Sequence, residues 1–177
     1  FSPTNNTAGF ANADTAWLAG GEVELRLGFG LFHEKLRKLF FQGNVAVAWS
    51  ETTLPQDQLN AGRAKRPLFY QSRYVTNMSL RFDDPDSGVM TGLVYNAFGP
   101  RLVEVGTTLG NVENPDVIEL AQHRLDFIVS YKPTDHVKIG LKWKNITFAR
   151  KRYQQGDELV LLENFGTSVS IGAEYIY

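Results

Sequence analysis

Apolar and polar residues alternate along seven segments of this chain, most clearly in the last one. In residues 167–177 apolar side chains occupy every second position, and small or polar side chains fill the positions between. Successive side chains of a β-strand point to opposite faces of its sheet, so a period of two predicts strands rather than helices. The pattern predicts strands over residues 15–29, 41–50, 68–82, 89–105, 121–132, 136–153 and 167–177.

The predicted connections differ in length at the two ends of the strands. Residues 83–88 and 133–135 are short segments rich in Asp, Pro, Ser and Thr, which are typical of tight turns. Residues 51–67 and 106–120 are long loops. Short and long connections therefore gather at opposite ends of the predicted sheet.

The other breaks in the pattern are less regular. Residues 31–40 predict one or two helical turns, and residues 1–14 and 154–158 predict loops. Gly99 and Pro100 interrupt the fourth strand, and proline inside a strand predicts a β-bulge near the rim of the sheet.

The two faces of the predicted strands differ in chemistry. One face is apolar at its central positions, and the other carries Glu22, Glu24, Arg26, Arg81, Asp126, Lys138, Lys142, Lys144 and Glu174. Consecutive charged positions on one strand face do not enter a dry core without partners. Aromatic residues mark both ends of the apolar face: Phe29, Phe41, Phe82, Tyr131 and Tyr177 at the short-turn end, with Trp17, Trp49, Tyr74 and Tyr95 at the long-loop end.

Composition narrows the class of protein. The chain has 177 residues, enough for one domain, and its net charge of −1 gives no field that would favour nucleic acid. No run of about 18 apolar residues predicts a membrane-spanning helix. There is no cysteine, which fits a periplasmic or outer-membrane protein and also many cytosolic ones. The chain opens on Phe1 without a signal peptide, so we expect a mature chain or a fragment.

Two all-β architectures fit this pattern. An antiparallel up-and-down transmembrane β-barrel turns the apolar face to lipid, and its short turns and long loops lie on opposite sides of the membrane. A soluble β-sandwich instead buries that face, and predicts that Val45, Val47, Leu125, Phe127 and Ile171 converge on one core. Seven strands leave two open edges in lipid, which unpaired backbone does not tolerate. Either residues 1–14 hold a further strand or the chain is a segment of a larger barrel, and we favour the second.

Side chains that could carry chemistry are few. For an outer-membrane enzyme the candidates are His123 with Asp126 and the pair Asp135 and His136, but His123 and Asp126 are expected on opposite strand faces. His33 is expected in a solvated turn. The basic run Arg63, Lys65 and Arg66 predicts a solvated loop or, alternatively, a patch for an anionic ligand or lipid head group.

No pattern in the sequence predicts a catalytic, metal or cofactor site. Three separated histidines without cysteine give no metal-ligand spacing, and no phosphate-binding loop is present. The lysine row Lys138, Lys142 and Lys144 is expected to face a wet lumen or to pair with Glu22, Glu24 or Glu174, and an anion-guiding role is the alternative.

Several fragments resemble, in their order along the chain, the C-terminal part of TonB-dependent outer-membrane receptors. Residues 170–177, with Ser170, Gly172, Tyr175 and Tyr177, are similar to the terminal insertion signal of outer-membrane barrels. The other fragments that carry the resemblance are GEVELR at 21–26, Gly43-Asn44, YVTN at 74–77, LVYNAFGPR at 93–101, Val105-Gly106, PDV at 115–117, Leu125-Asp126, Lys144-Asn145 and Phe165-Gly166.

The resemblance implies that residues 1–177 are the last seven strands of a 22-stranded barrel, with the plug domain and the earlier strands outside this chain. It implies a location in the bacterial outer membrane with a periplasmic C-terminus, and no enzymatic activity. It also implies energised uptake of a scarce nutrient such as a ferric siderophore, metal chelate, cobalamin or glycan. The implied partners are outer-membrane lipid, that small ligand, and the TonB–ExbB–ExbD complex acting through the absent plug. Substrate-binding residues stay unknown.

Overall fold

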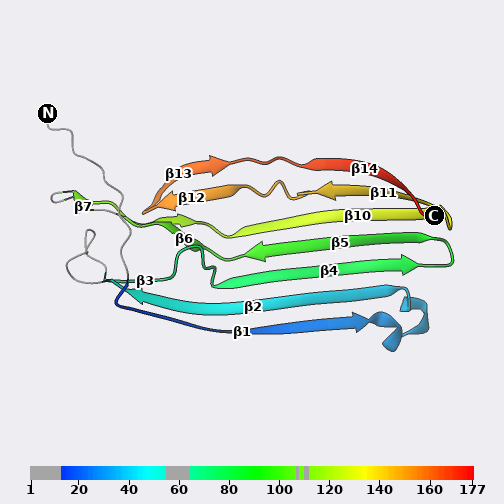
Figure 1. Cartoon of the computed structure of the whole chain (residues 1–177), viewed down its shortest axis with the longest axis horizontal. Coiled ribbons are helices and arrows are strands. Elements are labelled where there is room, and N and C mark those ends of the chain that lie inside the picture. The colour runs from blue at the N-terminus through cyan, green and yellow to red at the C-terminus, as the bar shows by residue number, and fades with distance from the viewer. Residues whose placement is uncertain (1–12, 55–63, 107, 110–111) are drawn as a thin grey trace.

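The chain folds as an antiparallel meander, which a computed structural model describes for residues 13–54, 64–106, 108–109 and 112–177. The main sheet has the strand order β1-β2-β4-β5-β10-β11-β14, with the short β3 paired to β2 (Figure 1). Two 3₁₀ turns, η1 and η2, join β1 to β2. The elements are β1 (Thr15–Gly28), η1 (Phe29–Leu31), η2 (Glu34–Leu36), β2 (Leu39–Thr53), β3 (Lys65–Arg66), β4 (Tyr74–Asp84), β5 (Val89–Phe98), β6 (Arg101–Glu104), β7 (Thr108–Leu109), β8 (Val112–Glu113), β9 (Val117–Glu119), β10 (Gln122–Thr134), β11 (Val137–Lys144), β12 (Lys151–Gln155), β13 (Glu158–Glu163) and β14 (Ser168–Tyr175).

The seven predicted strands are confirmed as the seven long strands of this sheet, and their pairing keeps the two faces chemically distinct. In antiparallel pairs, residues directly opposite each other share a face. One such row crosses seven strands without a charged residue, and a second row parallel to it crosses six strands, also without a charged residue. The first row is Leu27, Phe41, Leu80, Leu93, Phe127, Trp143 and Val169; the second is Leu39, Phe82, Thr91, Val129, Leu141 and Ile171.

A smaller sheet extends four of these strands at the long-loop end. Its order, β13-β12-β9-β6, repeats the order β14-β11-β10-β5 of the strands that it follows (Figure 1). The long strands thus break and resume rather than ending in loops. At this same end β7 and β8 form a separate short hairpin.

These breaks correct several predicted boundaries. The strand predicted over 89–105 ends at Phe98 and resumes as β6, so Gly99 and Pro100 mark a change of sheet rather than a bulge. A Cβ on Gly99 would lie 2.8 Å from the Tyr74 ring, so this close approach requires glycine. The strand predicted over 136–153 likewise divides into β11 and β12.

Other boundaries were also wrong. The loop predicted over 106–120 contains β7, β8 and β9, and a strand absent from the prediction, β13, precedes β14. The third strand begins at Tyr74 instead of residue 68, because Tyr70 adopts a left-handed conformation with φ of 57°. Of the loop predicted over 51–67, residues 51–53 belong to β2 and 65–66 form β3, while 55–63 lie outside the described residues, as do 1–12.

The apolar face of the main sheet has no second layer over it within the described part of the chain. The side chains expected to converge in a sandwich core stay accessible: Val45 is 37% exposed and Ile171 is 75% exposed. The fully or nearly buried apolar residues are instead Ala97, Leu102 and Val117, which lie toward the smaller sheet. The described residues therefore form an open, single-layered sheet and not the sandwich core of the alternative architecture.

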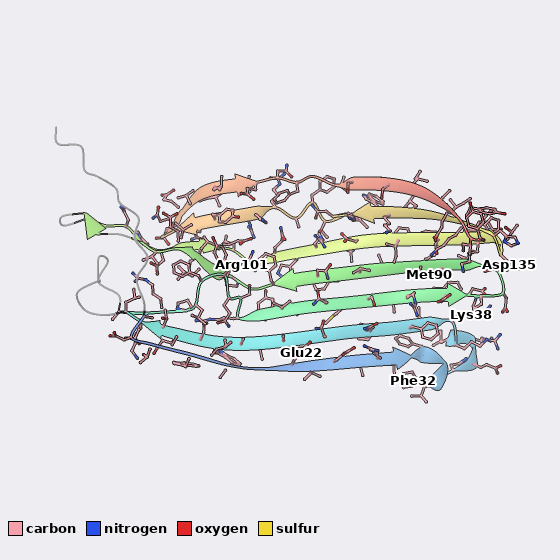
Figure 2. All side chains as sticks on the ribbon, viewed as in Figure 1. Glu22, Phe32, Lys38, Met90, Arg101 and Asp135 are labelled. Atoms are coloured by element: carbon pink, nitrogen blue, oxygen red, sulfur yellow. The ribbon has the colours of Figure 1, made fainter. Side chains whose placement is uncertain are left out.

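The connections at one end of the sheet are short, as predicted. Two residues separate β10 from β11, and four separate β4 from β5. Lys38 and Asp135 lie at this end and Arg101 lies at the other, with Glu22 between them (Figure 2). Among the described helical segments, none has the length and apolar character needed to cross a bilayer.

Candidate functional site: the polar face of the sheet

A row of polar side chains crosses five neighbouring strands on the face opposite the apolar one. Glu24 of β1 pairs in register with Asn44 of β2, Asn44 with Asn77 of β4, Asn77 with Asn96 of β5, and Asn96 with Arg124 of β10. Adjacent strands lie about 4.8 Å apart, so the row spans about 19 Å. We call these five residues the amide row.

Direct hydrogen bonds join part of the amide row. The Asn96 amide donates to Asn77 Oδ1 at 2.8 Å, and Arg124 donates to Asn96 Oδ1 at 3.3 Å. At the β1 end, the Asn44 amide donates to Glu22 at 2.6 Å, and Glu24 accepts from Arg26 at 2.6 Å. The amide row thus begins with the carboxylate of Glu24 and ends with the guanidinium of Arg124, and the three asparagines between them are neutral.

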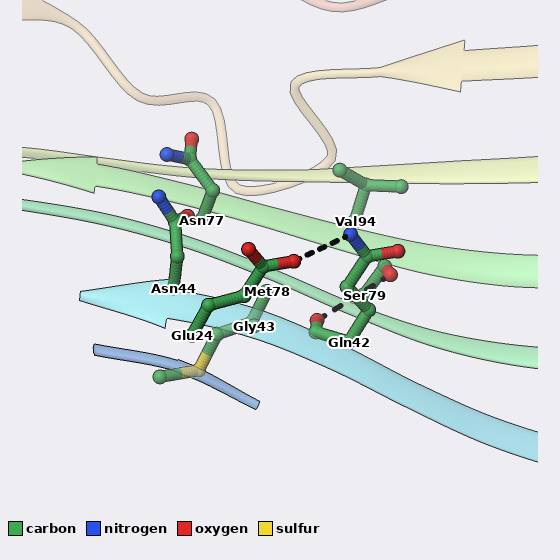
Figure 3. A pocket seen from close by; sticks show the side chains of 8 residues that line it. All are labelled: Glu24, Gln42, Gly43, Asn44, Asn77, Met78, Ser79 and Val94. Carbon is green, nitrogen blue, oxygen red and sulfur yellow. Dashed lines mark hydrogen bonds between the residues drawn. The ribbon is translucent and has the colours of Figure 1, made fainter. Parts of the chain in front are cut away.

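A shallow hollow of about 330 Å³ lies against the β1 end of this row (Figure 3). Gln42 and Ser79 complete its polar lining, and the Gln42 side chain donates to Glu24 at 3.4 Å. A side-chain amide has two donor hydrogens and an acceptor oxygen. The hollow therefore offers hydrogen bonds of both kinds to water or to a neutral, hydroxyl-rich solute.

Toward the short-turn end the same face becomes partly apolar. Gly28, Phe40, Arg81, Gly92 and Ile128 follow one another in register there. The Arg81 guanidinium lies 5.5 Å from the centre of the Phe40 ring, a cation–π contact. These five residues are part of the lining of a hollow of about 430 Å³ in this region.

The predicted lysine row lies on the polar face, but its predicted partners are only partly in reach. Lys138 lies directly opposite Glu174 in register, whereas Lys142 and Lys144 lie opposite Ser170 and Ser168. Within the described ranges none of the three lysines forms an ion pair. Glu22 and Glu24 stand on β1, at the far side of the sheet, so the pairing predicted with them is not formed.

The structure separates the candidate histidine and carboxylate groups. His123 Nδ1 lies 2.6 Å from the Tyr95 hydroxyl on one face, and Asp126 accepts from the Asn145 backbone N–H at 2.8 Å on the other. His136 Nδ1 lies 3.1 Å from the Ile176 carbonyl oxygen and its ring stacks on Tyr175. Neither pair has the aligned base and carboxylate of a hydrolytic site.

His33 is exposed, as predicted, but it also caps η2, because its Nδ1 accepts a hydrogen bond from the Lys35 backbone N–H at 3.1 Å.

The basic run is more ordered than a solvated loop. Arg63 lies outside the described residues, but Lys65 pairs with Glu51 at 2.9 Å. The Arg66 side chain is 5% exposed and contacts both oxygens of Asp116, at 3.2 and 3.3 Å. The prediction of a solvated loop is therefore wrong for Arg66, because the fold buries it beside a carboxylate 50 residues away.

A second buried ion pair ties the smaller sheet together. Arg101 donates to Glu119 at 2.8 Å, and Glu119 is 2% exposed. Burial, together with the nearby carboxylate of Glu119, raises the pKa of the Tyr153 hydroxyl. Arg101 also lies 4.5 Å from the centre of the Phe98 ring. These contacts stabilise the rim of the sheet at the end opposite the short turns.

Sequence reasoning missed the amide row and both buried ion pairs. Alternation placed Glu24 on the polar face, but only strand register aligns it with three asparagines. Arg66 and Asp116 meet because the chain folds back over 50 residues. No local motif signals such a contact.

No group of three or more His, Cys, Asp or Glu that could hold a metal ion is found where the structure describes the chain. Comparison with protein-family models, with curated protein sequences and with solved structures found no match to this chain.

Proposed function

We propose that this chain is the C-terminal segment of a TonB-dependent receptor barrel in the bacterial outer membrane, which takes up a scarce nutrient. The observation that carries the membrane part is the uncovered apolar face, which spans all seven long strands and has no charged residue at its centre. Hydrocarbon is the medium in which such a face is stable, because every second residue of a barrel strand meets lipid.

The positions of the aromatic residues support this proposal. Trp49 of β2 lies two residues nearer the short-turn end than Glu51, the register partner of Trp17 on β1. Tyr74 of β4 pairs with Val47 of β2, which lies two residues nearer the short-turn end than Trp49.

This diagonal continues across the sheet. Tyr95 of β5 pairs with Met78, and Trp143 of β11 shares a row with Leu93, which is still nearer the short turns. Strands of a membrane barrel tilt by about 35–45°, so residues at one depth form a diagonal across register rows. A single girdle of aromatics at one lipid interface accounts for the drift.

The second line of aromatics gives the width of the apolar band. Phe41 lies eight residues from Trp49 on β2, and Phe82 lies eight residues from Tyr74 on β4. At about 3.4 Å per residue this is about 27 Å along a strand, and tilt reduces it to about 20 Å across the membrane. An outer-membrane barrel has an apolar band about 25 Å tall, so the spacing is of the required size.

The open edges support membership of a larger barrel. Within the described residues, β1 pairs only with β2, and β14 pairs only with β11. Each outer edge therefore presents unpaired backbone groups, which are very costly in hydrocarbon. Further strands on both sides would satisfy them. The polar face would then line the lumen, where its charged residues meet water.

The nutrient uptake, the TonB–ExbB–ExbD partner and the periplasmic C-terminus rest on the resemblance of the sequence fragments. The ligand class proposed is a ferric siderophore, another metal chelate, cobalamin or a glycan. A segment of this kind would form the wall of the uptake path, without an enzymatic role.

Single-cysteine labelling tests the membrane orientation, because residues 1–177 contain no cysteine. Asp157→Cys lies in the β12–β13 turn and Asp135→Cys lies in the β10–β11 turn. We expect a membrane-impermeant maleimide to label position 157 in intact cells, and position 135 only after the outer membrane is opened. Equal labelling of both in intact cells argues against the proposed topology.

Uptake tests the transport part. Cells that express the full protein should accumulate its nutrient, and collapse of the inner-membrane proton gradient should abolish accumulation without loss of surface binding. Accumulation that persists without the gradient contradicts energised transport while leaving the barrel itself intact.

A further inference from the structure

The main sheet contains a gap where β2 changes partner. β2 pairs with β4 up to Ala48, whose N–H donates to the Arg73 carbonyl oxygen at 3.0 Å, and it pairs with β3 only from Thr52 onward. Between these points the chain leaves the sheet, and Leu68 donates its N–H to the Ser50 hydroxyl at 3.0 Å. A half-open pocket of about 190 Å³ lies at this gap.

One wall of this pocket is the buried Arg66. Its Nε contacts both oxygens of Asp116, and Asp116 Oδ1 also accepts the Gly106 N–H at 2.8 Å. The Asp116 carboxylate thus accepts hydrogen bonds from Arg66 Nε and from the Gly106 N–H, but not from Arg66 Nη2. Arg66 Nη2 is buried and has no hydrogen-bond partner in the described residues.

A second unsatisfied atom belongs to a residue that lines the same pocket. Gln71 Oε1 is also buried without a partner among the described residues. A buried polar atom without a partner costs about 1–3 kcal/mol, so such atoms are uncommon in native proteins. An occupant that accepts a hydrogen bond from Arg66 and donates one to Gln71 would satisfy both atoms.

The charges at the pocket favour an anion. Lys65, Arg66 and Arg73 line it together with the Glu51 carboxylate, and the Asp116 carboxylate contacts Arg66. Glu51 is already paired with Lys65, and Arg73 forms no ion pair where the structure describes the chain. A pocket of 190 Å³ holds about six waters at liquid density, which leaves space for a tetrahedral oxyanion with some water.

We propose that this pocket binds a protonated phosphate group, either hydrogen phosphate or a phosphate monoester. The phosphate oxygens accept from Arg66 and Arg73, and its remaining hydroxyl donates to Gln71 Oε1. This site is independent of the proposed transport function, because it depends only on the gap between β2 and β4. Sulfate has the same shape but no proton at neutral pH, and so leaves Gln71 unsatisfied.

Calorimetric titration of the full protein in detergent tests the proposal. The titration uses inorganic phosphate at about pH 6, which is close to the pKa for loss of the second proton of a phosphate group. Phosphate should bind at one site, and sulfate should bind about tenfold more weakly, the change expected for one lost hydrogen bond at a buried partner. Absence of phosphate binding, or equal affinity for sulfate, overturns the proposal.

Two variants connect the binding to this pocket. Arg73→Gln removes an exposed side chain without an ion pair, so the fold should persist, and phosphate should bind about tenfold more weakly. Gln71→Ala should remove the preference for phosphate over sulfate. The matched control is Lys132→Gln, an exposed lysine near the short turns, which should leave affinity unchanged. Wild-type affinity in both pocket variants contradicts the assignment.

The source of the phosphate group is resolved by a second titration. Dihexanoyl phosphatidic acid, a lipid with a phosphate monoester, is added in place of inorganic phosphate. Tighter binding of this lipid than of phosphate, lost in Arg73→Gln, indicates a head-group site. Binding of inorganic phosphate alone indicates a site for the free ion, and binding of neither overturns the proposal.

Discussion

The side-chain amide of Asn145 donates a hydrogen bond to the Gly166 carbonyl oxygen at 2.6 Å, and so joins the break between β11 and β12 to the break between β13 and β14. The same amide donates to the Ala149 carbonyl oxygen at 3.1 Å, while its oxygen accepts the Ala149 N–H at 2.8 Å. Asn145 is buried with φ of 56°, a conformation that asparagine tolerates better than most residues.

Asn145→Ala should therefore destabilise the protein. Three side-chain hydrogen bonds are lost, each worth about 1 kcal/mol, so the free energy of unfolding should fall by about 3 kcal/mol. Urea titration of the protein in detergent measures this. Asn164→Ala, which removes one exposed hydrogen bond to the Gly166 N–H, is the control and should cost about 1 kcal/mol or less. Equal losses for the two variants would mean that Asn145 does not hold the junction.

A charge on the apolar face tests what that face contacts. Ile171 lies at the centre of β14 and is 75% exposed in the isolated sheet. If it faces hydrocarbon, Ile171→Arg should lower the free energy of unfolding in a bilayer by about 2–4 kcal/mol. Ser170→Arg, on the opposite face, should change it by about 0.5 kcal/mol or less. Similar small effects at both positions would place the apolar face in water and contradict the proposed barrel.

The ion pair between Arg101 and the buried Glu119 allows a prediction about the stability of the rim of the sheet. Arg101→Met leaves the Glu119 carboxylate buried without a counter-ion, and should cost about 3–5 kcal/mol. Lys151→Met breaks the exposed pair with Glu163, in which the charged atoms are 3.8 Å apart, and should cost about 0–1 kcal/mol. Thermal unfolding of the two variants side by side distinguishes the pairs. A small loss in Arg101→Met would show that water reaches Glu119.

The short-turn end should show a defined pH dependence. Lys38 donates to Asp84 and, at 3.1 Å, to Asp86. The hydrogen bond from Lys38 holds the pKa of Asp84 below its ordinary 3.8, and the hydrogen bond to Asp84 holds the pKa of Lys38 above its ordinary 10.5. The contribution of Asp84 is complete above pH 3.8 and is lost as pH falls through the lowered pKa. That of Lys38 is complete below pH 10.5 and is lost as pH rises through the raised pKa.

Asp84→Asn should remove the acid part of this dependence. We expect the variant to be less stable than the natural protein at neutral pH, with the difference shrinking as pH falls from about 4 through the lowered pKa of Asp84, below which the natural carboxyl is protonated as well. Denaturant midpoints at several pH values measure it. Asp135→Asn, at the same end of the sheet, is the control and should keep the acid dependence of the natural protein. A constant difference between Asp84→Asn and the natural protein at all pH values contradicts the assignment.

The sequence by itself determined the number of long strands, their faces and the end at which the short turns lie. Alternation decides these features, because a period of two assigns each side chain to one face whatever the partner strand is. It placed Ile171 with the apolar residues and Glu24 with the polar ones before any pairing was known. Asp and Pro at the turns between β4 and β5 and between β10 and β11 are equally local signals.

Only the tertiary structure decided the breaks, the amide row and the buried ion pairs. Asn145 ends β11 because its side chain finds partners at Ala149 and Gly166, and the second of these lies 21 residues away. Asn44, Asn77 and Asn96 form a row because two separate registers, β2 with β4 and β4 with β5, coincide. These contacts join residues far apart in the chain, and the free energy that selects them comes from long-range pairing, which local residue preferences do not encode.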